Sequence, residues 1–286
     1  MPIFPQRAAA AVMLAAAAAA ASASGQTVVY TEKSKFENIV VYESDGERCM
    51  KFGSIDAPGR QSCQSLAHPD TLLFEYTKMM LGSLYLKPDP HNILVIGLGG
   101  GSLPRALAEV LPETRIDCVE IDPAVVSVAQ RYFGLKTGPR LRVFTDDGRD
   151  FVRQAAARGE KYDIVMLDAF DENYIPRRLM TREFLQEVGR ILSDDGVLAA
   201  NTFTASRQYA DESATYASVF GVFYNLRGNN RVILAKKDGL PPPSLLKRRA
   251  REWAPRLEPL GVDADRLLPM FSTRQDWPYA ARVLKD

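Results

Sequence analysis

The chain has 286 residues, of which 46% are hydrophobic and 25% are charged, as in an ordinary globular protein with one large domain or one large and one small domain. Its net charge is +1, so the composition indicates no basic surface and we expect no nucleic-acid partner. Beyond residue 25 no apolar run has the length and hydrophobicity of a membrane helix, so we expect no membrane span in the mature chain.

The first 25 residues, "MPIFPQRAAAAVMLAAAAAAASASG", differ from the rest of the chain. Arg7 precedes a short apolar segment, residues 8–21, and Ala21-Ser22-Ala23 has the small-x-small pattern of a cleavage site. We therefore predict a signal peptide over residues 1–23 and a periplasmic or secreted protein. Two other interpretations stay open, a misassigned start codon and a low-complexity tail, and either would leave the protein cytoplasmic.

Residues 26–68 are predicted to form a small antiparallel β-domain. The strand-like runs "NIVVYES" and "ERCMKFGS" flank Asp45-Gly46, a strong hairpin signal, and "GRQSCQS" follows as a third, weaker run. Cys49 and Cys63 lie in the second and third runs, so in an oxidising compartment they could form a disulfide; two unpaired thiols are the equally open alternative. With two His and no Cys/His cluster at metal-binding spacing, we expect no metal site.

Residues 69–286 are predicted to form one catalytic domain. It opens with a helix in "DTLLFEYTKMMLGSLYL", which "KPDPHN" ends with its two prolines. From Ile93 onward, continuous apolar strands alternate with amphipathic helices, which indicates an α/β fold with a doubly wound, mostly parallel Rossmann-like sheet of the methyltransferase type. After residue 205 we expect a further helix, a final strand in "NNRVILAKK" and a helical tail.

The first strand of this sheet runs into a glycine loop, "GLGGGS", which opens a helix. Gly97, Gly99 and Gly100 permit a ligand to lie against bare backbone, and the helix N-terminus that follows offers unpaired N–H groups. Glycines in such a turn can also serve packing alone, so the loop by itself is weak evidence for a nucleotide site.

Acidic residues strengthen the case because they end the next three strands. Glu120 follows the glycines by about twenty residues, the position from which an acid accepts the hydroxyls of a ribose. Asp147 could accept from the exocyclic amine of adenine while Gly148 leaves space for the ring. Asp168 and Asp171 would stand in the crevice at the carboxyl edge of the sheet. Any one of these acids could be an ordinary strand-end residue, but together they predict a nucleoside site.

The loop contains no Lys or Arg for phosphate, so the ligand is expected to be a nucleoside with a small charged tail, such as S-adenosylmethionine or a relative. At this point the chain resembles the spermidine synthase (polyamine aminopropyltransferase) family, from about Val28 to at least Leu234. The resemblance rests on the small β-domain, the helix with Tyr76, the "VEID" strand, the "DG" turn and the D-x-x-D loop.

The resemblance implies an enzyme that moves an aminopropyl group from decarboxylated S-adenosylmethionine to an amine such as putrescine and releases methylthioadenosine. The nucleoside is a co-substrate, and no permanently bound cofactor is implied. Asp168 would be the general base, with Asp171 and Tyr76 binding and orienting the amine and Gln61 and Glu37 as further polar residues of the amine site. Family members often form dimers, so a homodimer is the implied assembly.

The chain departs from the family pattern in the amine half of the site. Gly100 stands where the family has an acid that grips the aminopropyl amine, and Ala169 and Phe170 replace two hydroxyl residues of the D-x-x-D loop. Glu37 aligns with a family Gln. The pair Thr77-Lys78 stands where the family commonly has His or Gln followed by Glu.

Two other functions stay open. An S-adenosylmethionine-dependent methyltransferase is one, because the missing acid at Gly100 relaxes selection against the carboxylate of that donor. A non-catalytic nucleoside- or polyamine-binding protein is the other, because decarboxylated S-adenosylmethionine is made in the cytosol and an exported synthase would lack an obvious donor.

Overall fold

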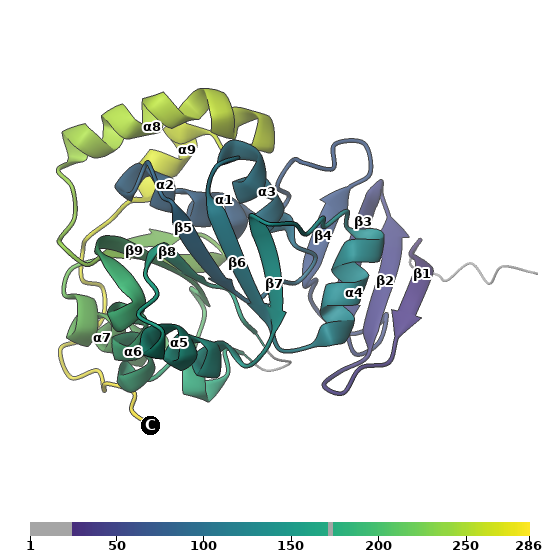
Figure 1. The fold of residues 1–286 in the computed structure, drawn as a ribbon, viewed down its shortest axis with the longest axis horizontal. Coiled ribbons are helices and arrows are strands. Elements are labelled where there is room, and N and C mark those ends of the chain that lie inside the picture. The colour runs from purple at the N-terminus through teal and green to yellow at the C-terminus, as the bar shows by residue number, and fades with distance from the viewer. Residues whose placement is uncertain (1–24, 171–173) are drawn as a thin grey trace, which may run out of the picture.

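The computed structural model describes residues 25–170 and 174–286 (Figure 1). The predicted signal peptide and Asp171 lie outside the described residues. An N-terminal four-stranded sheet has the order β1-β2-β3-β4. Its strands are β1 (Thr27–Glu32), β2 (Ile39–Ser44), β3 (Glu47–Phe52) and β4 (Ser62–Ser65).

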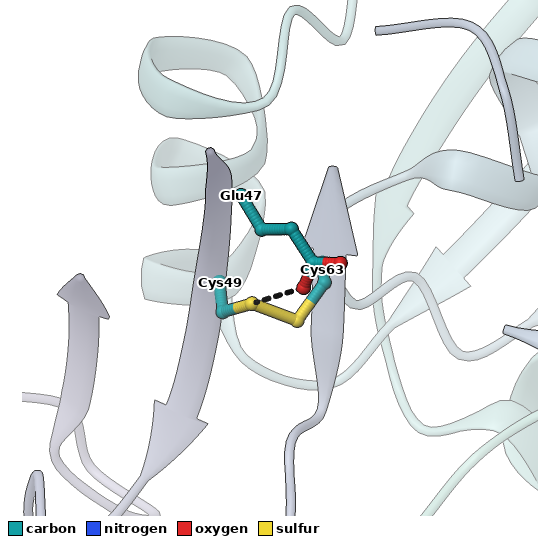
Figure 2. A group of neighbouring side chains, drawn as sticks. All are labelled: Glu47, Cys49 and Cys63. Atoms are coloured by element: carbon teal, nitrogen blue, oxygen red, sulfur yellow. Dashed lines mark hydrogen bonds between the residues drawn. A yellow bond between two sulfur atoms is a disulfide. The ribbon is translucent and has the colours of Figure 1, made fainter. Parts of the chain in front are cut away.

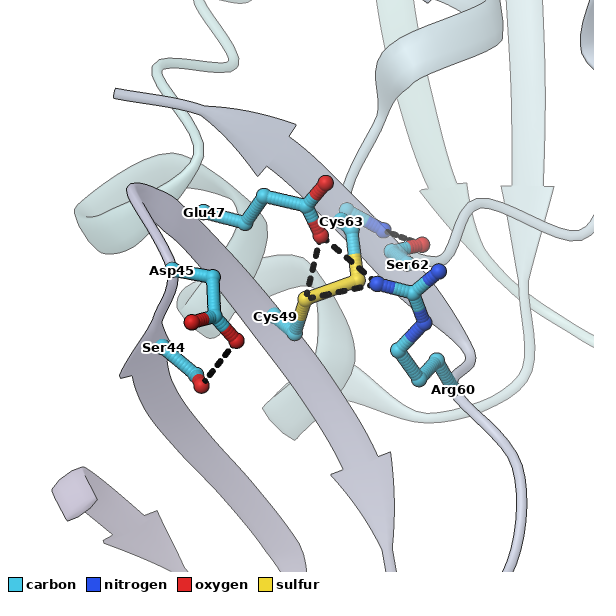
Figure 3. The surroundings of a disulfide bond; sticks show 8 residues. Ser44, Asp45, Glu47, Cys49, Arg60, Ser62 and Cys63 are labelled. Atoms are coloured by element: carbon cyan, nitrogen blue, oxygen red, sulfur yellow. Dashed lines mark hydrogen bonds and ion pairs between the residues drawn. A yellow bond between two sulfur atoms is a disulfide. The ribbon is translucent and has the colours of Figure 1, made fainter. Parts of the chain in front are cut away.

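The predicted hairpin lies between β2 and β3, which pair antiparallel up to Ser44 and Glu47. Asp45 and Gly46 both have positive φ, 52° and 76°, as the tightest two-residue hairpin turns require. Cys49 and Cys63 face each other directly on β3 and β4 and form a disulfide, with Glu47 and Arg60 beside it (Figures 2 and 3). Of the two alternatives that the sequence left open, the structure shows the bonded pair.

The second sheet has seven strands in the order β10-β11-β9-β8-β5-β6-β7. The strands from β9 to β7 in this order run parallel, and β11 and β10 add an antiparallel hairpin at one edge. The predicted doubly wound, mostly parallel sheet is confirmed. The strands are β5 (Asn92–Ile96), β6 (Arg115–Glu120), β7 (Leu141–Thr145), β8 (Tyr162–Leu167), β9 (Leu192–Phe203), β10 (Tyr224–Arg227) and β11 (Asn230–Lys236).

Helices cover both faces of this sheet, and α4 lies between it and the N-terminal sheet (Figure 1). The alternation of side chains along β5 shows why its sequence is continuously apolar: Ile93 and Val95 pack in one core, and Leu94 and Ile96 in the other. The helices are α1 (Glu75–Leu81), α2 (Ser83–Leu86), α3 (Ser102–Val110), α4 (Pro123–Tyr132), α5 (Gly148–Ala157), α6 (Arg182–Ile191), α7 (Tyr209–Phe220), α8 (Pro243–Leu257) and α9 (Ala264–Leu267).

The structure differs from the sequence prediction in three elements. Strand β1 lies in addition to the three runs expected in the N-terminal domain. The single helix expected before the linker is two, α1 and α2, separated at Gly82, where a Cβ would lie 2.9 Å from the ring of Phe271. Strand β10 has four residues and was not predicted, because so short a run carries little periodicity of its own. Its turn into β11 carries Gly228, Asn229 and Asn230 to the carboxyl edge of the sheet, where the site lies. No helix in the described ranges is long and apolar enough to cross a membrane.

Candidate active site

The carboxyl edge of the parallel strands opens onto a cavity of about 1170 Å³, bounded on its other side by α1 and residues of the N-terminal sheet. Ligands bind at this edge in open α/β sheets. Nine residues predicted for the site line the cavity: Glu37, Gln61, Tyr76, Gly97, Gly99, Glu120, Asp147, Gly148 and Asp168. Gly100 is not among the lining residues.

Asp168 follows the last residue of β8, and its N–H donates to the carbonyl of Ile96 at 2.8 Å, so the backbone fixes its position. Burial raises the pKa of Asp168 from 3.8 to about 7, while hydrogen bonds from Asn201 and Tyr76 oppose the rise. Asn201 Nδ2 donates to Oδ1 at 2.8 Å, and the Tyr76 hydroxyl donates to Oδ2 at 3.3 Å. A carboxyl group with a pKa near neutrality is suited to take a proton from a substrate and release it again.

Tyr76 reaches Asp168 from the first turn of α1, on the opposite side of the cavity from β8. Burial, followed by the charge of Asp168 and the hydrogen bond to it, raises the pKa of Tyr76 well above 10. The hydroxyl therefore remains a donor at neutral pH and holds one oxygen of Asp168, which restricts the orientation of that carboxyl group.

Asn201 is a site residue that the sequence analysis missed. It lies on β9, the strand next to β8, and its Oδ1 accepts a hydrogen bond from Asn230 Nδ2 at 3.0 Å, which turns its amide nitrogen toward Asp168. The available signal was an Asn after two alanines in "LAANTF", near the carboxyl end of a strand expected to be buried. A polar side chain at that position of such a strand faces the ligand crevice.

Replacing Asn201 with Ala should move the ascending limb of the pH–rate profile upward by about one pH unit. Loss of a hydrogen bond to the ionised form favours the protonated carboxyl, and one pKa unit corresponds to about 1.4 kcal/mol. Initial rates between pH 6 and 9 measure the shift. Asn230→Ala is the matched control, because it leaves the bond from Asn201 to Asp168 in place and should shift the limb less. An unchanged limb in Asn201→Ala would show that this hydrogen bond does not tune the base.

Glu120 lies at the end of β6 and lines the part of the cavity beside the glycine loop. Its two oxygens accept from the N–H groups of Leu98, at 3.1 Å, and Asp122, at 3.0 Å. Burial raises the pKa of Glu120, and these backbone hydrogen bonds oppose the rise. The carboxylate is thus fixed against the loop with further lone pairs available, as an acceptor for two ribose hydroxyls must be.

Asp147 has roles that the sequence did not indicate. Its Oδ1 caps α5 by accepting from the N–H groups of Arg149 and Asp150, and its Oδ2 pairs with Arg178 at 3.0 Å. At Gly148 a Cβ would lie 2.5 Å from Cγ2 of Ile96, so this glycine makes room first for a buried neighbour. Both residues line the cavity, and their contact with adenine stays a prediction.

Glycines are needed in this loop because atoms of neighbouring residues lie close to their α-carbons. Gly97 has a φ of 96°, and a Cβ there would lie 2.2 Å from the carbonyl oxygen of Asp168, so this glycine brings the loop and the base together. The N–H of Gly100 donates to Ser62 Oγ at 2.8 Å, and a Cβ would lie 3.0 Å from Cβ of Ser62 and 3.1 Å from the ring of Phe133. Gly100 therefore anchors the loop to β4, and its contact with a nucleoside stays a prediction.

Aromatic rings form the other end of the cavity. Phe170, Tyr174 and Phe203 lie with their ring centroids 5.3–6.2 Å apart, and all three line the cavity. Phe170 is one of the residues that replace hydroxyls in the family pattern, so this end of the cavity is more apolar than the motif predicts. Glu37 and Gln61 line the cavity from the N-terminal domain, and no described hydrogen bond joins their side chains to Asp168.

Known proteins resemble this chain in sequence. The model of the spermine/spermidine synthase domain matches residues 73–221. A polyamine aminopropyltransferase of Vibrio vulnificus (strain CMCP6) is 43% identical over 265 residues, which cover 91% of this chain and 89% of that protein.

Two further similarities are to a solved structure and to a eukaryotic methyltransferase. A crystal structure of spermidine synthase in complex with the transition state analogue AdoDATO has the same fold, with a TM-score of 0.69 and 20% identity over 86% of this chain and 85% of that one. The eEF1A lysine and N-terminal methyltransferase of Homo sapiens is 34% identical over 161 residues, 51% of this chain and 22% of that protein. Because the domain model matches more than half of the chain and the bacterial relative is similar over nearly its whole length, the chain belongs to the spermine/spermidine synthase family.

Proposed function

We propose that the protein is an aminopropyltransferase that uses decarboxylated S-adenosylmethionine as donor and a primary amine such as putrescine as acceptor. The observation that carries the proposal is Asp168: a buried carboxyl with a pKa of about 7, oriented by Asn201 and Tyr76 in the cavity that also contains the ribose acceptor Glu120. The 43% identical polyamine aminopropyltransferase supports it.

The reaction needs one proton acceptor and good positioning. The acceptor amine is cationic at neutral pH, and Asp168 takes the proton that frees its lone pair. The nitrogen then forms a bond to the aminopropyl carbon attached to the sulfonium, the carbon–sulfur bond breaks, and its electron pair stays on sulfur to give neutral methylthioadenosine. Because the sulfonium is a good leaving group, holding donor and amine in line supplies much of the rate.

Isothermal calorimetry tests the donor assignment. Decarboxylated S-adenosylmethionine, S-adenosylmethionine and methylthioadenosine are titrated in parallel into the mature protein, with Asp147→Ala as the control for the nucleoside end. Tighter binding of the decarboxylated donor than of its parent supports aminopropyl transfer. Equal or reversed preference would contradict it.

Methyl transfer from S-adenosylmethionine is the second candidate. One observation in its favour is the loop at Gly100, where the backbone N–H donates to the hydroxyl of Ser62 and no acid stands to repel the carboxylate of S-adenosylmethionine. The other is the similarity to the human methyltransferase over 51% of the chain. Preference for S-adenosylmethionine in the same titrations supports this candidate, together with methyl transfer to an amine or peptide.

We also propose that the protein is exported and acts as a homodimer. Export is supported by the signal-peptide pattern of residues 1–23 and by the disulfide, since structural disulfides persist in oxidising compartments. A cytoplasmic location is the alternative. Fractionation of cells that produce the full chain decides between them, and light scattering measures the oligomeric state that the family resemblance implies.

Reduction of the Cys49–Cys63 disulfide should lower the free energy of unfolding by about 3 kcal/mol, because the bridge closes a short loop, with a sequence separation of 14. Guanidinium unfolding of the wild type with and without reductant measures the effect, and Cys63→Ser should match the reduced protein. Cys118→Ser is the control: Cys118 is a free, buried thiol, so this variant should keep the response to reductant. A wild type whose midpoint ignores reductant would show that the bridge does not form.

A further inference from the structure

Glu75 is a carboxylate in the cavity to which neither the family motif nor the proposed mechanism gives a role. It is the first residue of α1, directly before Tyr76, and its exposed side chain lines the same cavity as Asp168. Within residues 25–170 and 174–286, no hydrogen bond or ion pair engages its oxygens, and Lys78 on the same helix interacts with it only through longer-range charge attraction. A carboxylate at the wall of a ligand cavity without such a partner is suited to bind a cationic group of the ligand.

Gly228, in the turn from β10 to β11, lies against this carboxylate. A Cβ at Gly228 would lie 2.2 Å from Glu75 Oε2, so the carboxylate rests against a bare α-carbon. The β10–β11 turn therefore sets the position of the Glu75 carboxylate, and an alanine there would displace it.

The same turn connects Glu75 to the base. Asn230 donates from Nδ2 to Asn201 Oδ1 at 3.0 Å, and Asn201 donates from Nδ2 to Asp168 Oδ1 at 2.8 Å. Asp168 thus contacts a polar row on β9 and β11 that begins at Asn230, and Glu75 lies against Gly228 in the turn that leads into β11. Both line one cavity, and a ligand can reach both.

The aromatic wall described above borders this row. Phe203 pairs with Asn230 across β9 and β11, and its ring centroid lies 5.3 Å from that of Phe170 and 5.6 Å from that of Tyr174. These rings offer apolar surface to methylene groups and negative π faces to a nearby cation. The arrangement fits a molecule with an amine at one end, an apolar chain and a second cation.

We propose that Glu75 is a specificity-determining residue that binds the second cationic group of the acceptor. This rests on the proposed function in assigning the reacting amine to Asp168. The acceptor nitrogen lies at Asp168, its chain lies along Phe203 and Phe170, and its distal cation lies at Glu75.

The experiment compares 1,4-diaminobutane with 1-aminobutane, which has the same chain without the second charge. Glu75→Gln should raise KM for the diamine about fivefold, the effect of losing about 1 kcal/mol from a partly solvated ion pair, and leave KM for the monoamine unchanged. Gly228→Ala should act in the same direction, because its Cβ meets the movable end of Glu75 rather than the backbone. Glu109→Gln, an equal charge change on the exposed side of α3, should alter neither value.

The readouts separate this inference from the proposed function. If the wild type turns over the diamine and Glu75→Gln affects both amines equally, or neither, the assignment of Glu75 is overturned while aminopropyl transfer stands. If the wild type releases no methylthioadenosine with any amine, the proposed function fails, and calorimetric titration of 1,4-diaminobutane in the presence of methylthioadenosine decides on Glu75. Weaker binding to Glu75→Gln than to wild type then supports the inference; equal binding, or none to either protein, overturns it.

Discussion

Asp168→Asn is expected to lower kcat for aminopropyl transfer by a factor of about 10²–10⁴, the usual contribution of a positioned general base. The amide keeps the size of the carboxyl: its oxygen can still accept from Asn201, and its NH2 group can donate to the Tyr76 hydroxyl, but it cannot take the proton of the acceptor amine. Steady-state release of methylthioadenosine measures the loss, and calorimetry with methylthioadenosine should show unchanged binding. A variant that retains the wild-type rate would remove Asp168 from the chemistry.

The pH dependence of the wild type provides a second test of the same group. With the pKa of Asp168 raised to about 7, the fraction of the base form increases through neutrality, so kcat/KM should rise with pH from about 6 to 8. Asp168→Asn should lack this limb.

The contribution of Asp168 to folding stability should fall with rising pH, whereas kcat/KM rises. Measuring stability therefore tests whether a change in rate is caused by unfolding. A carboxyl with a raised folded-state pKa contributes stability that is fully present below its unfolded pKa of 3.8 and is lost as the pH rises through about 7. Asp168→Asn should therefore melt at a higher temperature than wild type at pH 8, with a smaller difference at pH 5. A lower melting temperature at pH 8 would contradict the buried, charged state of Asp168.

Glu212→Gln should lower the free energy of unfolding by about 3–5 kcal/mol, because it leaves a buried guanidinium without its counter-charge. Arg231 is 0% exposed and pairs with Glu212, itself 2% exposed, at 2.9 Å. Its other groups donate to Thr202 Oγ1 and Ser213 Oγ, and its guanidinium lies 4.0 Å from the ring centroid of Tyr209. The cluster joins α7 to β9 next to Asn201, so the loss should appear in chemical unfolding and in the rate.

Two variants isolate the buried charge as the cause. Asp211 lies on α7, the helix of Glu212, and pairs at the surface with Arg282 from the C-terminal tail. Arg282→Ala breaks this pair and should lower the free energy of unfolding by no more than about 1 kcal/mol. The double replacement Arg231→Met with Glu212→Leu removes both charges and should be less destabilised than Glu212→Gln alone. A Glu212→Gln protein as stable as wild type would mean that Arg231 finds compensation elsewhere.

The sequence predicted the sheet well because each parallel strand is buried on both faces and reads as an apolar run followed by a helix. It also predicted most of the residues that meet in the cavity, because ligand-facing side chains follow the carboxyl ends of those strands. Strand β10 escaped prediction because four residues carry little pattern. The disulfide could not be decided because it depends on the register that places Cys49 opposite Cys63.

Other parts of the site depend on neighbours that only the fold supplies. Asn201 matters because β9 lies beside β8, and Glu75 because the β10–β11 turn brings Gly228 against it. Gly148 and Gly100 were assigned to the nucleoside by motif, and packing against Ile96 and Ser62 is a further reason for glycine at these positions. Motifs therefore identified most of the residues that line the cavity, while the fold supplies the neighbours that position them.

Product analysis tests the central claim most directly. The mature protein is incubated with decarboxylated S-adenosylmethionine and putrescine, and the mixture is analysed by mass spectrometry beside Asp168→Asn. We expect methylthioadenosine and the aminopropylated amine in equal amounts from the wild type and a reduction of both by at least about a hundredfold in the variant. Absence of the aminopropylated amine from the wild type, or its formation at the same rate without the carboxylate of Asp168, would contradict the account.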